Sequence, residues 1–182
     1  MLKVWQRLRA PVVGMVHLPP LPGSPQGALS LPAIERGAVR DAEALARGGV
    51  HGLMMENFGD VPFYPGRVPA HTVAQMTALA AAVRRAVGLP LGINVLRNDG
   101  LSALAIAHAV GAEFVRVNVL SGARVADQGV LQGIAHDLLR YRRELGASVK
   151  ILADVNVKHS APLGDYPFED EVEDLLRRAL AD

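Results

Sequence analysis

The chain has 182 residues, half of them hydrophobic and a fifth charged, a balance typical of a soluble globular protein with a sizeable core. A net charge of +1 without a basic stripe excludes nucleic acid as the main partner, and the absence of cysteine excludes disulfides and thiolate metal sites. The N-terminal residues 1–9 alternate apolar and charged side chains, and no signal-peptide core follows them. Because the longest apolar stretches have the length of strands, we predict no transmembrane segment and a cytoplasmic protein.

One pattern repeats along the chain: a short β-rich run, a loop rich in Gly, Pro, Asn or Asp, and then a helical segment. The predicted elements are strand Val12–His17, helix Pro32–Arg47, strand Gly52–Glu56, helix His71–Val87, strand Leu91–Leu96, helix Leu101–Val110, strand Phe114–Leu120, helix Val130–Leu145, strand Lys150–Val157 and helix Phe168–Leu180. Thr72 and Gln75 predict a capping box in the second helix. Gly88, Gly111 and Gly146 lie where helix C-caps are expected.

Strict alternation of strands and helices predicts parallel strands joined by helical crossovers, in either an open doubly wound sheet or a closed barrel. A doubly wound sheet buries both faces, so its strands should be almost wholly apolar. Here Val115, Val117 and Val119 instead alternate with Arg116 and Asn118. The last strand likewise sets Ile151, Ala153, Val155 and Val157 against Asp154, Asn156 and Lys158. Polar residues near the strand ends that face an axis favour the α/β fold of (β/α)8 TIM-barrel type.

The barrel is predicted to be incomplete. A typical barrel needs about 250 residues and eight strands, whereas residues 1–182 supply a single partial domain of β/α units one to five. An open sheet of five strands would leave two unpaired edges and an uncovered inner face. We therefore expect a truncated chain, or one that is closed by a homo-oligomer partner or by a missing C-terminal segment.

Extending the same alternation to the first two strands gives a polar set at the barrel mouth, which we take as the candidate site. The candidate catalytic residues are Glu56, Asp154, His17 and Lys158. The candidate substrate-binding residues are Asn94, Arg116, Asn118 and Asn156 at strand ends, with Asn57 and Asp127 on adjoining loops. Balanced charges separated by amides suit a small polar, hydroxylated ligand. Asp60 and Gln128 are further loop residues that could line the mouth.

Each candidate also has a structural interpretation. Arg116 and Asp154 could form a buried ion pair without chemistry, and Lys158 could be a surface lysine rather than a Schiff-base amine, general base or anion clamp. His17 is either an acid/base group or a hydrogen-bonded histidine. No cofactor is predicted, and a divalent cation such as Mg²⁺ at His17, Glu56 and Asp154 is the less favoured alternative. Asn98 and Asp99 are interpreted as helix N-caps rather than ligands.

Six stretches of the chain resemble one known family. They are Gly14–Pro25 (GMVHLPPLPGSP), Met55–Phe63 (MENFGDVPF), Gly92–Asp99 (GINVLRND), Phe114–Leu120 (FVRVNVL), Asp127–Gly129 (DQG) and Ala153–His159 (ADVNVKH). In this order they are similar to the BtpA family, also called BtpA/SgcQ. The resemblance implies a full barrel related to phosphate-binding TIM barrels, of which this chain lacks the final third.

For function, the resemblance implies two different roles, photosystem I assembly or stability at the thylakoid membrane and sugar metabolism, and no settled mechanism. Three hypotheses follow. The first is an enzyme that acts on a small polar metabolite, sugar- or nucleoside-like, with or without a phosphate group. Glu56, Asp154 or His17 would act as acid or base, while Lys158 and Arg116 neutralise negative charge. The second is a non-catalytic assembly factor, and the third is an inactive, truncated family member.

Overall fold

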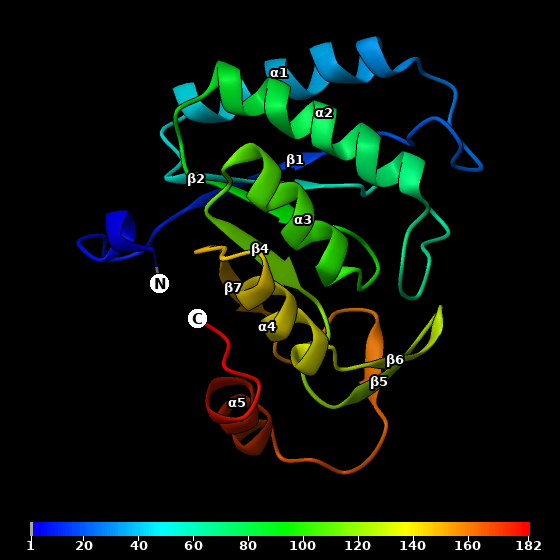
Figure 1. Ribbon diagram of the computed structural model, residues 1–182, viewed down its shortest axis with the longest axis vertical. Coiled ribbons are helices and arrows are strands. Elements are labelled where there is room, and N and C mark those ends of the chain that lie inside the picture. The colour runs from blue at the N-terminus through cyan, green and yellow to red at the C-terminus, as the bar shows by residue number, and fades with distance from the viewer. Residues whose placement is uncertain (1) are drawn as a thin grey trace.

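The computed structural model describes residues 2–182, and its main feature is a parallel sheet of five strands (Figure 1). The elements are η1 (Lys3–Trp5), β1 (Val13–His17), α1 (Leu31–Arg47), β2 (Gly52–Glu56), α2 (Ala70–Ala86), β3 (Leu91–Asn94), α3 (Gly100–Val110), β4 (Phe114–Val117), β5 (Ala123–Ala126), β6 (Gly129–Gln132), α4 (Ala135–Glu144), β7 (Lys150–Ala153), β8 (Ser160–Pro162) and α5 (Phe168–Arg177). No helix of residues 2–182 combines the length and apolarity that crossing a bilayer requires.

The five strands lie in the order β1-β2-β3-β4-β7, and every neighbouring pair is parallel. The prediction of parallel strands joined by helical crossovers is therefore confirmed. The register sets His17 opposite Glu56 and Glu56 opposite Asn94, so the strands of this half of the sheet end level with one another. Because parallel strands share one carboxyl edge, polar residues at their ends meet there.

The two faces of the sheet are covered differently. On one face, strand residues such as Met55, Ile93 and Ile151 pack in the main core together with helix residues such as Met76 and Leu104. Figure 1 shows helices α1 to α4 side by side along the sheet, and α1, α2, α3 and α4 contact one another in that order. The other face, called the inner face below, carries the alternate residues, as strand geometry requires.

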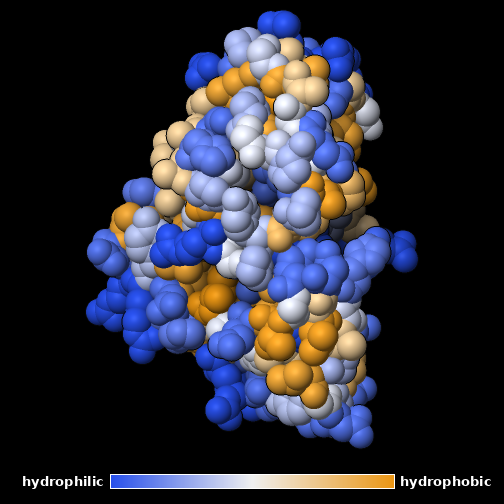
Figure 2. Space-filling model, turned by 90° about the vertical axis from the view of Figure 1, so that its right-hand side faces the viewer, coloured by the Kyte–Doolittle hydropathy of each residue, from blue (hydrophilic) through white to orange (hydrophobic). Residues whose placement is uncertain are grey.

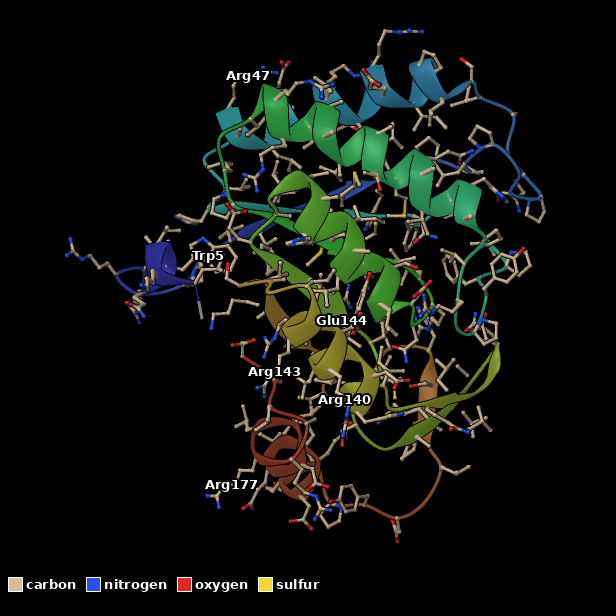
Figure 3. The ribbon with its side chains drawn as sticks, viewed as in Figure 1. Trp5, Arg47, Arg140, Arg143, Glu144 and Arg177 are labelled. Atoms are coloured by element: carbon tan, nitrogen blue, oxygen red, sulfur yellow. The ribbon has the colours of Figure 1, made fainter. Side chains whose placement is uncertain are left out.

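At the N-terminal end of the inner face, aromatic residues form a second, smaller core. Trp5 and Phe114 meet edge to face with their ring centroids 5.3 Å apart, and the Trp5 indole N–H donates to the His51 carbonyl at 2.8 Å. Figure 3 shows Trp5 beside the starts of the strands. A Cβ on Gly92 would lie 2.3 Å from the Phe114 ring, so the rings fit only over a glycine. The apolar end of the inner face is thus closely packed.

The predicted strands and helices differ from the observed ones mainly after Asn118. The predicted strands Leu91–Leu96, Phe114–Leu120 and Lys150–Val157 end earlier, at Asn94, Val117 and Ala153. Beyond Ala153 the chain turns away, and Asn156 adopts a left-handed conformation with φ of 53° that a strand cannot contain.

The predicted helix Val130–Leu145 is also wrong in its first part. Residues Gly129–Gln132 form β6, which pairs with β5 in a hairpin, while the helix begins only at Ala135. Together with β8 these strands make a separate antiparallel sheet in the order β6-β5-β8 that the sequence analysis missed. The last helix ends at Arg177, before the predicted Leu180.

The predicted capping devices have mixed outcomes. Thr72 lies within α2, whose N-cap is Pro69, and the Gln75 amide donates to the Pro22 carbonyl instead, so the capping box is wrong. Gly111 is confirmed as the left-handed C-cap of α3, and Gly146 has a φ of 60° just after α4. Gly88 follows the actual C-cap of α2, which is Val87.

Candidate functional site

Six polar side chains from the predicted mouth set come together at the carboxyl ends of β1, β2, β3, β4 and β7. We call them the strand-end cluster: His17, Glu56, Asn94, Arg116, Asn118 and Asp154. His17 and Glu56 are the last residues of β1 and β2, and Arg116 lies on the inner face of β4. Figure 2 shows the carboxyl-end face of the molecule, where hydrophilic and apolar residues are interspersed.

Arg116 is the centre of this cluster because its guanidinium bonds to two carboxylates at once. Its Nε and Nη2 donate to the two oxygens of Asp154, each at 2.8 Å, and its Nη1 donates to Glu56 Oε1 at 2.8 Å. The Asn118 amide adds a further donor to Asp154 at 2.8 Å. Such a two-pronged contact fixes the plane of the guanidinium as well as its position.

The charges of the cluster do not balance. The hydrogen bond that Arg116 donates to Asp154 raises the pKa of Arg116 above its usual range despite the opposing effect of burial, and the charges of Asp154 and Glu56 raise it further. Arg116 therefore stays charged, and because it is one cation between two carboxyl groups, the formal charge of the three side chains is −1. Glu56 is only 4% exposed, so this charge is largely shielded from water. A proton on a ligand or on His17 would neutralise it.

His17 is the cluster member most open to solvent. Its side chain is 44% exposed, its Nε2 lies 3.5 Å from Glu56 Oε2, and its ring stacks on Phe58 with centroids 4.3 Å apart. Contacts at one nitrogen and one ring face orient the imidazole. This arrangement, a carboxylate behind an accessible imidazole, is the one that general acid/base catalysis uses.

Asn94 offers an acceptor that nothing in the described chain uses. Its amide nitrogen donates to the Arg116 carbonyl at 2.9 Å and approaches Asn118 Oδ1 at 3.5 Å. Its Oδ1 is buried and lacks a hydrogen-bond partner among residues 2–182. Buried polar atoms are nearly always bonded, so an unpaired acceptor at a strand end is a natural contact for a ligand hydroxyl.

Two predicted members of the mouth set lie outside the cluster. Asn156 accepts a hydrogen bond from Arg124 at 3.0 Å, in the connection between β7 and β8. Lys158 is exposed, and its backbone carbonyl accepts a bond from Arg97, while in the described part of the chain its ammonium contacts no carboxylate. The reason is that strand geometry ends at Ala153, so alternation no longer governs where these side chains point.

The loop candidates have structural partners. Asn57 is buried and bridges two loops, since its Oδ1 accepts from the Leu96 N–H at 2.7 Å and its amide donates to Asp60 at 3.1 Å. Asp127 lies exposed at the tip of the β5–β6 hairpin, where the Gln128 amide donates to it at 2.5 Å. Neither residue contacts the strand-end cluster within the described chain.

Asn98 and Asp99 precede α3, and their interpretation as helix N-caps is confirmed for one of them. Asp99 is the N-cap of the helix, since its Oδ1 accepts from the Ser102 N–H at 3.0 Å. Asn98 is not a cap. It accepts from the Val119 N–H at 2.8 Å and donates to the Val119 carbonyl at 3.0 Å, which fixes the segment after β4.

The arrangement also bears on metal binding. Residues 2–182 contain no group of three His, Cys, Asp or Glu side chains placed to hold a metal ion. Between Glu56 and Asp154 lies the Arg116 guanidinium, so a Mg²⁺ ion that used both carboxylates with His17 would meet a fixed positive charge. The geometry therefore disfavours the Mg²⁺ alternative.

Sequence reasoning missed the buried charge of Arg124. Arg124 on β5 is buried and donates to Ser160 at 2.7 Å, to Asn156 at 3.0 Å and to Glu171 at 3.3 Å, which ties the small sheet to α5. The signal was available, because two short alternating runs flank Asp127-Gln128-Gly129, a turn sequence typical of a hairpin.

Taken together, the parallel sheet and its strand-end cluster define a class: α/β proteins that carry a polar site at the carboxyl edge of a parallel sheet. Residues 8–182 match the BtpA family model, and the chain belongs to the BtpA family. The family resemblance noted in the sequence is thereby confirmed.

Three relatives show how the family is spread. The chain is 52% identical to the photosystem I biogenesis protein BtpA of Synechocystis sp., over 94% of this chain and 60% of that protein. It is 50% identical to an uncharacterised protein of Thermococcus kodakarensis, over 96% of this chain and 66% of the relative. An uncharacterised mitochondrial protein of Caenorhabditis elegans is 36% identical over 87% and 60%. The chain thus spans about 60% to 66% of the length of these relatives.

Proposed function

We propose that this protein binds a small polar metabolite at the strand-end cluster and that His17 exchanges a proton with it. The observation that carries the proposal is the contact between the exposed His17 imidazole and the buried Glu56 carboxylate. A buried carboxylate behind a histidine stabilises the imidazolium that forms when the ring takes up a proton. The ligand would approach from solvent, where the ring is open.

The other cluster members support His17 rather than react themselves. Asp154 is engaged by Arg116 and Asn118, so it acts as a positioning residue that fixes the guanidinium. Arg116 in turn fixes Glu56, and Glu56 orients His17. Arg116 already forms ion pairs with two carboxylates. It would therefore add little stabilisation to a negative charge that develops on a ligand. The unpaired Asn94 Oδ1 would accept a hydroxyl of the ligand.

Turnover in a defined metabolite mixture tests this proposal. The full chain is incubated with small polar metabolites, and consumption is followed by mass spectrometry. We expect the wild-type protein to consume at least one compound, and His17→Asn to slow this by about 10²- to 10⁴-fold, the usual contribution of a general acid or base. His108→Asn, which changes an exposed histidine on α3, is the matched control. Equal rates for His17→Asn and wild type would remove His17 from the proposed role.

We further propose that the sheet is an arc of a (β/α)8 barrel. In support, the five strands are sequential parallel neighbours, helices α1 to α4 line one side, and polar residues lie at the carboxyl ends. After α5, the Asp182 N–H already donates to the Ile151 carbonyl on β7 at 2.9 Å, as a following parallel strand would. A second copy or a segment equivalent to the rest of the longer relatives would close the barrel.

Light scattering distinguishes the ways of closing the barrel. If a second copy pairs with the sheet edges, the purified chain is a dimer or larger. If an additional segment is needed, extending the chain with the C-terminal third of the Thermococcus relative raises its unfolding midpoint and yields a monomer. A monomer that unfolds sharply, and that gains nothing from the extension, would contradict the barrel proposal.

A second candidate function is assembly without catalysis, favoured by the name of the Synechocystis relative, a photosystem I biogenesis protein. This role predicts tolerance of changes in the strand-end cluster. Replacing Glu56, Asn94 and Asp154 together by Gln, Ala and Asn in a Synechocystis strain that depends on this chain would decide between the two. Retained photosystem I levels support the assembly role, and their loss in a stably folded variant supports the metabolite site. An inactive family member is indicated if even the wild-type chain fails in both assays.

A further inference from the structure

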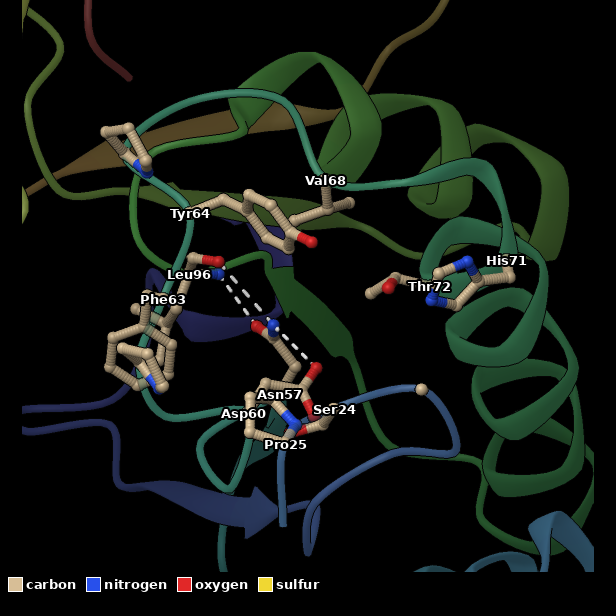
Figure 4. A pocket seen from close by; sticks show the side chains of 13 residues that line it. Ser24, Pro25, Asn57, Asp60, Phe63, Tyr64, Val68, His71, Thr72 and Leu96 are labelled. Atoms are coloured by element: carbon tan, nitrogen blue, oxygen red, sulfur yellow. Dashed lines mark hydrogen bonds between the residues drawn. The ribbon is translucent and has the colours of Figure 1, made fainter. Parts of the chain in front are cut away.

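A cavity lies among the loops that follow β1 and β2, and we propose that it binds an uncharged ring compound rich in hydroxyl groups, such as a free sugar or an unphosphorylated nucleoside. Figure 4 shows this loop cavity, of about 310 Å³, between the loops that follow β1 and β2 and the first turn of α2. It is lined by Gly23, Ser24, Pro25, Asn57, Asp60, Pro62, Phe63, Tyr64, Pro65, Val68, His71, Thr72 and Leu96. The volume is within the range of small-molecule sites.

The loop cavity is separate from the strand-end cluster. Glu56 and Asn57 follow one another in the chain but turn to opposite sides of it. Glu56 contacts Arg116 on the inner face, whereas Asn57 contacts Leu96 and Asp60 at the loop cavity. A ligand in the loop cavity is therefore held by other residues than those proposed above for proton exchange, and the present inference does not depend on that function.

Hydroxyl groups without protein partners carry the inference. Thr72 is only 6% exposed, yet its hydroxyl forms no hydrogen bond within residues 2–182. The Ser24 hydroxyl oxygen is buried and also has no partner in the described chain. In Figure 4 the hydroxyl groups of Tyr64 and Thr72 point toward the same space from opposite sides. A buried hydroxyl without a partner, such as that of Ser24, is costly unless a ligand or water bonds to it. All three hydroxyls can both donate and accept, so each can bond to a hydroxyl of a ligand in the cavity.

The charges of the lining select against anions. Asp60 is the one carboxylate of the lining and His71 is its one imidazole, and no lysine or arginine of the described chain lines the cavity. Asp60 accepts one bond at each oxygen, from the Leu21 N–H at 2.8 Å and from the Asn57 amide at 3.1 Å. A carboxylate has about four acceptor positions, so it can still accept from ligand hydroxyls. A phosphate group next to Asp60 would be repelled by its negative charge.

The remaining walls are apolar and favour a ring. Pro62, Phe63, Tyr64 and Pro65 line the cavity together with Val68 and Leu96. Figure 4 shows Leu96 on the same side as Phe63, and Val68 beside Tyr64. Aromatic and proline rings provide flat apolar surfaces on which the faces of a sugar or a nucleobase can pack. Flat apolar walls with scattered hydroxyls and one carboxylate match a neutral ring that carries several hydroxyl groups.

Ligand titrations by NMR test the inference with the full chain. One arm uses free hexoses and pentoses, the other uses nucleosides, and each compound is paired with its phosphorylated counterpart. We expect at least one neutral compound to bind and its phosphorylated form to bind at least tenfold more weakly. Binding in either arm supports the inference and identifies the source of the ring. Absence of binding by all neutral compounds at 10 mM, or tighter binding of the phosphorylated forms, overturns it.

Matched variants locate the bound compound. Thr72→Val removes the hydroxyl with little change of shape and should weaken binding about 5- to 10-fold, the usual effect of one lost hydrogen bond. Thr77→Val changes a threonine of the same helix whose hydroxyl donates to the Val73 carbonyl, and should leave binding unchanged. Tyr64→Phe, at a half-exposed position, provides a second test if Thr72→Val folds poorly. Unaltered affinity in both Thr72→Val and Tyr64→Phe overturns the assignment.

One further variant separates the two proposals. His17→Asn should slow turnover at the strand-end cluster by the factor given above, yet bind the neutral ring as the wild type does. If it also loses the ring compound, the ligand lies at the strand-end cluster and the loop cavity is not its site.

Discussion

The two ends of the inner face are built from the same alternate strand positions but have opposite chemistry. At the N-terminal end, Trp5 packs edge to face against Phe114, whose ring lies over Gly92. At the C-terminal end, Arg116 is held between Glu56 and Asp154. In parallel α/β folds the amino ends of strands serve stability and the carboxyl ends serve function. Strand β4 supplies Phe114 to the apolar end and Arg116 to the polar end. Two positions along one strand therefore separate a core residue from a residue of the candidate site.

The largest expected effect comes from removing the aromatic packing. Phe114→Ala leaves a cavity in a fully buried site and should lower the free energy of unfolding by about 3–5 kcal/mol. Denaturant titration measures this. The same change at the other end, Phe58→Ala, removes a half-exposed ring and should cost less than about 1 kcal/mol. Similar losses at both positions would contradict the contrast between the ends.

A second experiment removes the cation from the polar end. Arg116→Met leaves two carboxylates close together without their shared partner, and should cost about 2–4 kcal/mol of unfolding free energy. The value lies below that of a fully buried pair because the Arg116 side chain is 33% exposed. Adding Glu56→Gln and Asp154→Asn should recover most of the loss. Failure to recover would mean that Arg116 stabilises the fold by packing rather than by charge, and Arg140→Met on the surface of α4 controls for general effects.

We expect Asp182, at the rim of the apolar end, to make a pH-dependent contribution to the free energy of unfolding. Burial tends to raise the pKa of Asp182, but hydrogen bonds from Lys150, the Ile151 N–H and Arg142 outweigh it and lower the pKa below its ordinary value of 3.8. A lowered pKa in the folded state means that the ionised carboxylate stabilises the fold above the ordinary value. This contribution is lost as the pH falls through the lowered pKa.

Asp182→Asn should therefore cost about 1 kcal/mol at neutral pH, a modest value because the contacts lie at the surface. Comparing unfolding of variant and wild type across pH checks this, with Asp137→Asn, an exposed residue of α4, as control. The difference should shrink in acid. A difference that is constant across pH would show that the Asp182 carboxylate does not carry this effect.

The smallest effect on stability is expected for His17→Asn. The ring is exposed on one side and lies only at contact distance from Glu56, so the free energy of unfolding should change by less than about 0.5 kcal/mol. Loss of activity without loss of stability would mark the polar end as functional. A large destabilisation would instead make His17 a structural residue of the sheet.

Alternation along the strands was enough to predict the strand-end cluster. Arg116 on β4 and Glu56 at the end of β2 lie on the inner face because neighbours in a strand point to opposite sides. The same rule failed for Asn156 and Lys158, since the strand stops at Ala153 and Asn156 turns left-handed. Polar and apolar residues can continue to alternate in the sequence after the strand has ended, and there the alternation no longer predicts which way a side chain points.

The small sheet was missed for a related reason. Val130 has the helical spacing of Ile134 and Leu138 further along the chain, and this spacing predicts a helix that begins at Val130. In the structure Val130 and Leu131 belong to β6, which pairs in a hairpin with the strand just before it, β5. Gly129 has a φ of 97°, a conformation that suits a turn and not a helix, and this glycine was the available signal. Tertiary pairing outweighed local propensity here.

Trp5 is the one tryptophan of the sequence. It is shielded from water, its indole N–H is bonded, and its ring leans on Phe114 at the end of the sheet remote from both proposed ligand sites. Fluorescence excited at this residue therefore provides an intrinsic optical gauge of one end of the molecule alone. Its emission maximum should shift to longer wavelength when that end unfolds, whereas a ligand bound at the opposite end should leave the emission maximum unchanged.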